Sequence, residues 1–369
     1  MKKGEAKPID YVFLALTGAL TVLGLFAFFS ASLGVLAKNE AQFYQILLSQ
    51  LGLGLGVGSL GLFLAIKVPH LWWRKHASTF LILALIITAC VFIPHVGFSH
   101  GGARRWISIF GVSFQPVEFL KVAFVMYLAA WLSWAKKKVK SPLYSILPLL
   151  VVLGLIASVL AFQPDMKSLI LMTVTGIGML FLSGTPLKQL IGLGAVAVTL
   201  FLVAAFSVPY LRDRMATFLN PSHDPTGSSY QLQQGLIAIG SGKLNGRGFG
   251  QSIQKFSYLP EPQGDSIFAV IGEEFGFIGS VVIVVLYMLF AMRGLWISQR
   301  APDAFSGLFA AGLVILMTFQ VFMNIASITG LFPLTGVPLV FMSQGGTSLA
   351  ISLAAAGIIL GISRERKTA

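Results

Sequence analysis

Three apolar runs follow one another between residues 142 and 208. They read PLYSILPLLVVLGLIASVLAF (142–162), SLILMTVTGIGMLFLSG (168–184) and LKQLIGLGAVAVTLFLVAAFSV (187–208). An α-helix needs about 20 mainly apolar residues to cross the hydrocarbon core of a bilayer. Each run is close to that length and holds at most one charged residue. The sequence therefore predicts three consecutive transmembrane helices, the last two joined by a tight turn.

The same pattern extends over the whole chain of 369 residues, which is 56% hydrophobic and 11% charged. Soluble globular proteins carry about 25% charged residues, so the composition excludes an ordinary soluble enzyme. We predict an all-α polytopic membrane protein that forms a single integral membrane domain over residues 1–369. About ten transmembrane helices are expected, at residues 11–31, 45–66, 78–94, 116–135, 142–162, 168–184, 187–208, 266–292, 304–328 and 346–363.

The formal net charge of +13 comes from 26 basic and 13 acidic residues. The basic residues lie between apolar runs and not on one face, which argues against a nucleic-acid partner. If the N-terminus is cytoplasmic, 16 basic residues fall in inside segments and 4 in short outside loops. The positive-inside rule therefore predicts that both termini are cytoplasmic. The single cysteine, Cys90, provides neither a disulfide framework nor a cysteine metal site.

Two outside segments are longer than simple connections. Residues 94–115 contain GGARRWISIFGVSFQ, which mixes arginine with aromatic residues and predicts an interfacial or re-entrant element. Residues 209–265 form a large extracytoplasmic loop between helices 7 and 8, and loops of that length are usually functional. This loop holds a helical pattern, YQLQQGLIAIG (230–240), and a glycine-rich stretch, GSGKLNGRGFG (240–250). The glycine-rich stretch lacks the spacing of a nucleotide P-loop, so we expect tight turns there.

Carboxylates inside or beside the hydrocarbon are costly, so each is a candidate functional residue. Glu118 and Lys121 stand three residues apart on one helix face and are expected to pair. We expect five acids to gather around one outer cavity, namely Glu118, Asp165, Asp265, Glu273 and Glu274. Structural interpretations stay open. The Glu118–Lys121 pair can be a helix lock, Asp165 and Asp265 can cap helices, and the paired glutamates suit a helix dipole.

Several motifs resemble the SEDS proteins (shape, elongation, division and sporulation). They are FSAS (29–32), ARRWISIFGVSFQPVEFLK (103–121), QPD (163–165), the stretch from FLNPSHDPTGSSYQ to IGEEFGFIG (218–279), and NIASITGLFPLTGVPLVFMSQGGTSL (324–349). Together they cover about a third of the chain. The segments GQSIQKFSYLPEP (250–262) and PLTG (333–336) are more similar to the FtsW branch of that family than to the RodA branch.

The resemblance implies a ten-span SEDS fold and a peptidoglycan glycosyltransferase that polymerises lipid II for septal cell-wall synthesis. It places the essential carboxylate at Asp265 and functional roles at Glu118, Lys121, Asp165 and Ser343. It also implies a Mg²⁺ or Mn²⁺ requirement without an organic cofactor. The implied partners are a class B penicillin-binding protein with transpeptidase activity and other divisome proteins. The implied location is the bacterial inner membrane at the division septum, with an extracytoplasmic active site.

The chain departs from the family pattern beside the essential acid. It reads Gln263-Gly264-Asp265 where the family has His-Thr-Asp, and SQGGTS (343–348) where a tyrosine is usual. Because the acids are retained, we still expect activity.

The implied reaction converts an α-linked sugar diphosphate into a β-1,4 link, so the anomeric carbon inverts. Such a displacement needs a general base, for which we predict Asp265. It also needs cations for the leaving diphosphate, and arginine matches phosphate oxygens well. The candidates for this role are Arg104, Arg105, Arg247 and Lys255.

Three alternatives are a lipid II flippase or transporter, a RodA-like elongation polymerase, and a non-catalytic scaffold. A transporter predicts charges through the full depth of the membrane. The charged residues within the predicted spans gather instead toward the outer side, which favours chemistry at the membrane surface.

Overall fold

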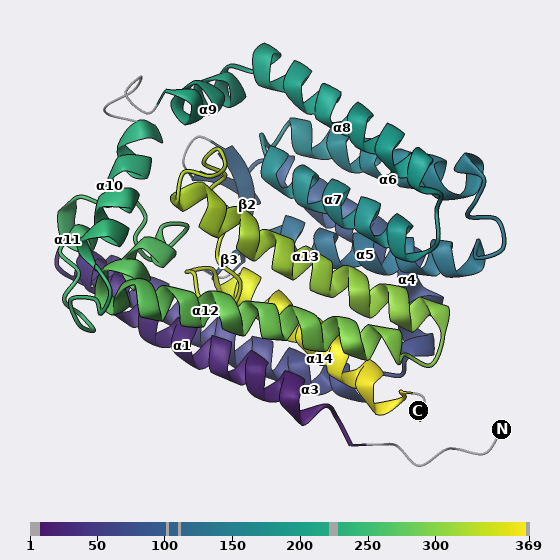
Figure 1. Ribbon diagram of the computed structural model, residues 1–369, viewed down its shortest axis with the longest axis horizontal. Helices are drawn as coiled ribbons and strands as arrows, with labels where there is room; N and C mark the ends of the chain where they lie inside the picture. Colours follow the sequence, from purple (N-terminus) through teal and green to yellow (C-terminus); the bar gives the residue numbers. More distant parts are fainter. Residues whose placement is uncertain (1–7, 101–102, 110–111, 221–227, 367–369) are drawn as a thin grey trace.

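The computed structural model describes residues 8–100, 103–109, 112–220 and 228–366. Long helices run side by side along the molecule, and both ends of the chain lie at one end of the bundle (Figure 1). We call this the terminus end, and we call the opposite end, which carries α10 and α11, the loop end. The apolar helices are α1 (Tyr11–Leu36), the continuous stretch α2–η1–α3 (Glu40–Leu48, Ser49–Val57, Gly58–Lys67), α4 (His70–Ala89, extended by the short η2, Cys90–Phe92), α5 (Pro116–Trp134), α6 (Pro142–Ala161), α7 (Met166–Leu182), α8 (Leu187–Ser207), α12 (Ile267–Gln299), α13 (Ala304–Ile328) and α14 (Gly346–Arg364).

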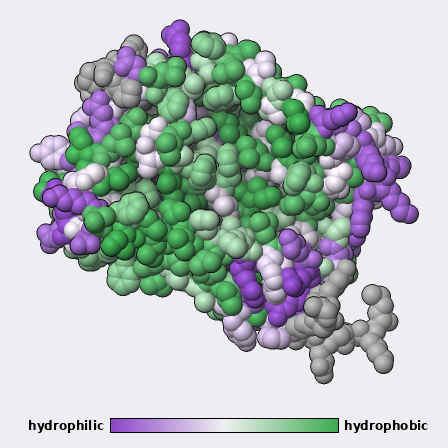
Figure 2. Space-filling model, in the orientation of Figure 1, coloured by the Kyte–Doolittle hydropathy of each residue, from purple (hydrophilic) through white to green (hydrophobic). Residues whose placement is uncertain are grey.

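The prediction of a polytopic α-helical membrane protein is confirmed. In the described part of the chain, nine helical segments are long and apolar enough to cross a membrane, and α7 adds an apolar helix of 17 residues. These ten segments correspond to the ten predicted spans. The space-filling view shows apolar residues over the middle of the molecule and polar residues gathered toward its ends (Figure 2). This distribution is the one expected of a protein whose waist lies in hydrocarbon.

Helix boundaries follow ordinary capping chemistry. Asp10 and Asp303 accept backbone hydrogen bonds at the starts of α1 and α13, and α5 and α6 each begin at a proline. The buried core is built mainly from α5, α13 and α14, while α8 lies at the periphery and buries few of its residues. The functional residues described below lie where the central helices reach the loop end.

Residues 94–115 contain a small sheet, a secondary structure that the sequence did not predict. The sheet is three-stranded and antiparallel, with β1 (Gly97–His100), β2 (Ala103–Ile109) and β3 (Val112–Phe114). Alternate side chains of a strand point to opposite faces, and Ile107 of β2 is buried while Ser108 is exposed. The segment ARRWISI therefore forms a half-buried strand.

The large loop contains three helices, α9 (Pro209–Leu219), α10 (Ser228–Ser241) and α11 (Gln254–Ser257). Of these, only α10 was predicted, and residues 221–227 lie outside the described part of the chain. The glycine-rich stretch makes turns with positive φ at Gly246, Gly248 and Gly250, as expected.

This stretch is bound to a break in α12. Gly276 has φ 66° and ψ −163° inside that helix. The Arg247 N–H donates to the Glu273 carbonyl at 3.0 Å, and the Phe277 N–H donates to the Lys243 carbonyl at 2.9 Å. The glycine-rich stretch and the break in α12 are therefore joined by hydrogen bonds in both directions.

The terminus end is closed by an ion-pair cluster. Asp10 is almost fully buried and binds Arg293 through two side-chain nitrogens, at 2.8 Å for the shortest contact. Arg366 reaches the same carboxylate at 3.2 Å, and the Asp10 N–H donates to the Ser363 hydroxyl at 3.0 Å. The guanidinium group of Arg293 also lies 4.0 Å from the ring centre of Trp296. The first and last described helices are thereby joined.

Candidate active site

Asp265 lies just before α12 at the loop end, and its main chain is held by neighbouring elements. Asn324 on α13 donates to the Asp265 carbonyl at 2.8 Å and to the Val337 carbonyl at 2.7 Å. The Ser343 hydroxyl donates to the Gly264 carbonyl at 2.6 Å, and the Gln344 N–H donates to the Gln263 carbonyl at 2.7 Å. Although Asp265 belongs to a long loop in the sequence, its backbone is fixed to α13 and to the segment that leads into α14.

The carboxylate of Asp265 faces two cations across Gly336. A Cβ placed on Gly336, which has φ 65°, would lie 3.4 Å from Asp265 Oδ2, 3.9 Å from Lys167 Nζ and 4.0 Å from Arg214 Nη2. The other carboxylate oxygen, Oδ1, accepts a hydrogen bond from the Gln231 amide of α10 at 3.1 Å. Residues from α7, α9, α10 and the segment after α13 thus converge on one acid.

Burial raises the pKa of Asp265 above its ordinary value, although Lys167, the Gln231 hydrogen bond and Arg214 act in the opposite direction. A carboxylate with a raised pKa has a higher proton affinity, which suits a general base at neutral pH. The charges of Lys167 and Arg214 favour the ionised form of Asp265 and so limit the rise in its pKa. The environment of Asp265 is therefore compatible with the predicted role.

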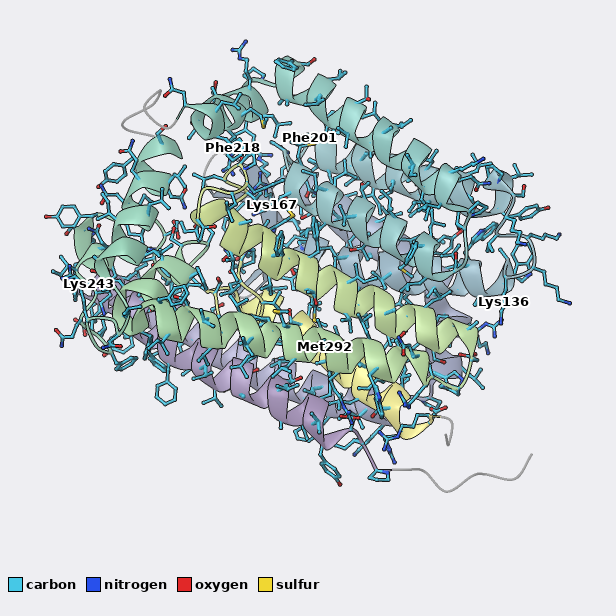
Figure 3. The ribbon with its side chains drawn as sticks, viewed as in Figure 1. Lys136, Lys167, Phe201, Phe218, Lys243 and Met292 are labelled. Carbon is cyan, nitrogen blue, oxygen red and sulfur yellow. The ribbon has the colours of Figure 1, made fainter. Side chains whose placement is uncertain are left out.

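Lys167 is the central cation of the site, and it was not among the residues predicted from the sequence. Its ammonium group donates to the Gly336 carbonyl and interacts electrostatically with Asp165, Asp265 and Glu118. Lys167 lies toward the loop end of the molecule (Figure 3) and lines the same pocket as Phe201. In the sequence it is one basic residue in a short loop. Its position two residues after Asp165 was the available signal.

Of the two neighbouring arginines in β2, Arg105 reaches the site and Arg104 does not. Arg105 donates through Nε to the Gln163 carbonyl at 3.0 Å and through Nη2 to the Pro164 carbonyl. Arg104 lies on the opposite face of the strand and is exposed. The strand geometry therefore separates two residues that looked equivalent.

Asp165 is fully buried and accepts from the Ser168 hydroxyl at 2.8 Å. It stands at the first boundary of α7 but accepts no backbone hydrogen bond there. Asp265 likewise does not cap α12, whose boundary residue is Ser266. The helix-cap interpretation is therefore wrong for both acids within the described part of the chain.

The predicted Glu118–Lys121 pair is present, with 2.9 Å between Lys121 Nζ and Glu118 Oε1. Both side chains are buried in α5. Lys121 also donates to Gln320 Oε1 on α13 at 2.9 Å, and Gln320 in turn donates to the Pro338 carbonyl at 3.1 Å. The pair is thus linked to the chain segment that contacts Asp265.

We expected the five acids to surround one cavity, and this prediction is wrong. Glu273 and Glu274 form a separate cluster with the large loop. Lys255 Nζ contacts Glu274 Oε1, the Ser30 hydroxyl and the Gly250 carbonyl at 2.7, 2.9 and 2.8 Å, and its side chain has no exposed surface. All three ammonium donors are used, so we assign Lys255 to loop attachment and not to substrate binding.

Arg247 belongs to the same cluster, since its Nε lies 3.4 Å from Glu273 Oε1. The Ser252 hydroxyl donates to the other oxygen of that glutamate at 2.6 Å. The Ile253 N–H donates to Glu273 as well, at 3.1 Å. These bonds hold the segment before Asp265 against the first part of α12.

A divalent cation held by protein ligands does not fit the donor set of this site. Within the described residues, no three His, Cys, Asp or Glu side chains lie together in a way that could hold a metal ion. Each carboxylate at the site lies near a cation of the chain, although Asp165 Oδ1 is buried without a hydrogen-bond partner. Glu118 pairs with Lys121, and Asp165 and Asp265 interact with Lys167.

The fold and the site define a class of protein, namely a multi-pass membrane protein with a fixed, buried acid and a cluster of cations at one end of its helical bundle. The chain belongs to the FtsW/RodA/SpoVE family, whose profile, described as "Cell cycle protein", matches residues 10–368. This confirms the family that the motifs indicated.

Individual relatives agree with the family assignment. The chain is 36% identical over 355 residues to stage V sporulation protein E of Bacillus subtilis, covering 96% of this chain and 97% of that protein. It is 38% identical over 360 residues to the "probable peptidoglycan glycosyltransferase FtsW" of Trichlorobacter lovleyi, covering 98% and 94%.

Two solved structures share the fold. A chain from a structure described as "Structural coordination of polymerization and crosslinking by a peptidoglycan synthase complex" matches with a TM-score of 0.79 and 26% identity, over 97% of this chain and 98% of that chain. The rod shape determining protein RodA of Thermus thermophilus matches with a TM-score of 0.70 and 25% identity, over 98% of each chain.

Proposed function

We propose that this chain is a peptidoglycan glycosyltransferase that polymerises lipid II into glycan strands, with Asp265 as the general base. The observation that carries the proposal is the convergence of a backbone-fixed acid with Lys167 and Arg214 around Gly336. Relatives named as probable peptidoglycan glycosyltransferases support the same activity.

In the proposed reaction, the 4-hydroxyl group of the acceptor sugar attacks the anomeric carbon of the donor. The bond from that carbon to the diphosphate breaks as the β-1,4 bond forms, and the anomeric carbon inverts. Asp265 accepts the hydroxyl proton, a role typically worth about 10²–10⁴-fold in rate. The lipid diphosphate leaves with the electron pair of the broken bond. Gln231, Asn324 and Ser343 hold the base in position through the contacts given above.

We further propose that the termini are cytoplasmic, that the loop end is extracytoplasmic, and that the chain acts at the division septum. The distribution of basic residues supports this orientation. The similarity to a chain of a peptidoglycan synthase complex supports a class B penicillin-binding protein as partner, together with other divisome proteins.

The test is polymerisation of labelled lipid II by the purified chain, with and without the transpeptidase partner, read as glycan ladders on a gel. Ladders are expected from the wild type and not from Asp265→Asn, which keeps the size of the side chain. Near-normal ladders from Asp265→Asn rule out the base assignment. Absence of ladders under every partner and cation condition rules out the polymerase, and leaves a transporter or a scaffold to be tested.

A further inference from the structure

Two hydrogen-bond donors beside Lys167 are buried and unused. Among the described residues, Arg214 Nε and the Thr335 hydroxyl have no hydrogen-bond partner although neither atom is exposed. Burying a donor without a hydrogen-bond partner is unfavourable, and native proteins keep few such donors. Arg214 also donates through Nη1 to the Leu334 carbonyl, and its guanidinium carbon lies 4.6 Å from the ring centre of Tyr210.

These donors line one pocket with two further cations. Arg105, Lys167, Arg214 and Thr335 form its polar wall, and Phe201 and Ile170 contribute to its apolar wall. The pocket holds about 40 Å³ in this conformation, which is room for a few water molecules. A larger anion would therefore displace water and move the partly exposed arginine side chains outward. Positive charge and unmet donors next to apolar walls match a phosphate group attached to a lipid.

The pocket adjoins the proposed base. Lys167 and Arg214 both face Asp265 across Gly336, so an anion bound between them lies next to the reacting centre. Lys167 has three ammonium donors, of which the Gly336 carbonyl takes one. The remaining donors are available to phosphate oxygens.

We propose that Lys167, Arg105 and Arg214 bind the diphosphate of the lipid-linked substrate directly, and that the Lys167 ammonium group supplies the positive charge for which a protein-held divalent cation would otherwise be needed. This inference rests on the proposed function, and it assigns the diphosphate subsite within that function. It replaces Arg247 and Lys255 of the sequence prediction, which attach the loop to α12, and it leaves out Arg104, which lies on the outer face of β2.

The test measures binding of undecaprenyl diphosphate to the purified full-length chain by native mass spectrometry, in EDTA and then in Mg²⁺. Undecaprenyl monophosphate is the comparison ligand. The wild type is expected to prefer the diphosphate in EDTA, with an affinity that Mg²⁺ changes by less than about twofold. Lys167→Met removes hydrogen bonds from a charged donor, and a loss of about 10–100-fold in affinity is expected.

Lys188→Met is the matched control, because Lys188 is exposed at the start of α8 and the variant makes the same change in charge. It is expected to bind like the wild type. Lys167→Arg keeps the charge and is expected to retain most of the affinity. Thermal unfolding of each variant identifies any loss that comes from misfolding.

Two results overturn the proposal. One is diphosphate binding by the wild type only when Mg²⁺ or Mn²⁺ is present, a measurement that needs no variant. The other is wild-type affinity in folded Lys167→Met. Glycan ladders are scored separately, so the two proposals fail independently. If diphosphate binding depends on Lys167 but no glycan ladders form, only the polymerase proposal is rejected. If ladders form but diphosphate binding does not depend on Lys167, only this subsite is rejected.

Discussion

The side-chain amide of Gln231 on α10 donates to the carboxylate of Asp265 at 3.1 Å, and the same nitrogen lies 3.1 Å from the Ser266 hydroxyl. A helix inside the large loop thus contacts the proposed base itself. Because this hydrogen bond favours the ionised carboxylate, it holds the pKa of Asp265 lower than burial alone would place it.

Gln231→Leu is therefore expected to raise the pKa of Asp265 further. The base works when deprotonated, so polymerisation should fall as the pH drops through this pKa, already higher than that of an ordinary aspartate. In the variant the acid limb of the pH–rate profile should move to higher pH, while the rate at alkaline pH changes less. The measurement is kcat/KM for lipid II between pH 5 and 9. Gln299→Leu, at an exposed position at the terminus end, serves as control, and an unmoved acid limb contradicts the assignment.

Glu118→Ala is expected to lower both stability and activity. It leaves the buried Lys121 without its ion-pair partner, and loss of one member of a buried pair typically costs about 3–5 kcal/mol. Thermal unfolding in detergent measures the loss. The double variant Glu118→Ala/Lys121→Met should recover stability, because it removes the unpaired charge. If it also recovers activity, the pair is only a helix lock; if activity stays low, the pair shapes the site through Gln320 and Pro338.

Gly276→Ala is expected to destabilise the attachment of the loop to α12. The added Cβ would lie 2.3 Å from Gly246 N and 2.5 Å from the Leu244 carbonyl oxygen, at a φ of 66°. Sparsely populated backbone conformations cost about 1–3 kcal/mol for residues with a side chain, and the close contacts add to this. Limited proteolysis within residues 243–257 should become faster and the melting temperature should fall.

Gly192→Ala in α8 is the matched comparison, because a Cβ there meets nothing within 4 Å. It should stabilise the helix by up to about 1 kcal/mol. Equal effects of the two alanines would show that the contacts at the break in α12 are unimportant.

Asp10→Asn is expected to destabilise the protein at neutral pH. Burial opposes ionisation, but the hydrogen bonds and charges of Arg293, and the charge of Arg366, lower the pKa of Asp10 below its ordinary value of 3.8. A lowered folded-state pKa stabilises the fold above the unfolded value, and this contribution disappears as the pH falls through the folded value. The free energies of unfolding of the wild type and the variant should therefore differ by a constant amount above about pH 5. The two free energies should converge in acid. A difference that grows on acidification contradicts this account.

The sequence was sufficient for the transmembrane helices and for local pairs. Runs of about 20 apolar residues have few alternatives to a membrane helix, and a spacing of three residues places Glu118 beside Lys121 without further information. The family motifs added Asp265 and Ser343, which the structure brings into contact through Gly264. These inferences depend on short stretches of chain.

The remaining site could not be predicted because it depends on contacts between distant segments. Lys167, Arg214 and Gly336 come from three separate regions and meet only when the helices pack. Arg105 and Arg104 became distinguishable only when residues 103–109 proved to be a strand. The acids separated into two groups because Glu273 and Glu274 lie in the first part of α12, where the break at Gly276 leaves them bonded to the loop.

The fixed backbone of Asp265 has a consequence for inhibitor design. Its carbonyl is bound by Asn324 and the preceding peptide by Ser343, so the main chain of the acid is held in place before any ligand arrives. A compound with an ammonium group facing Asp265 and a diphosphonate facing the two cations would meet a target that needs little rearrangement of its main chain. Little of its binding free energy would then be lost to ordering the protein.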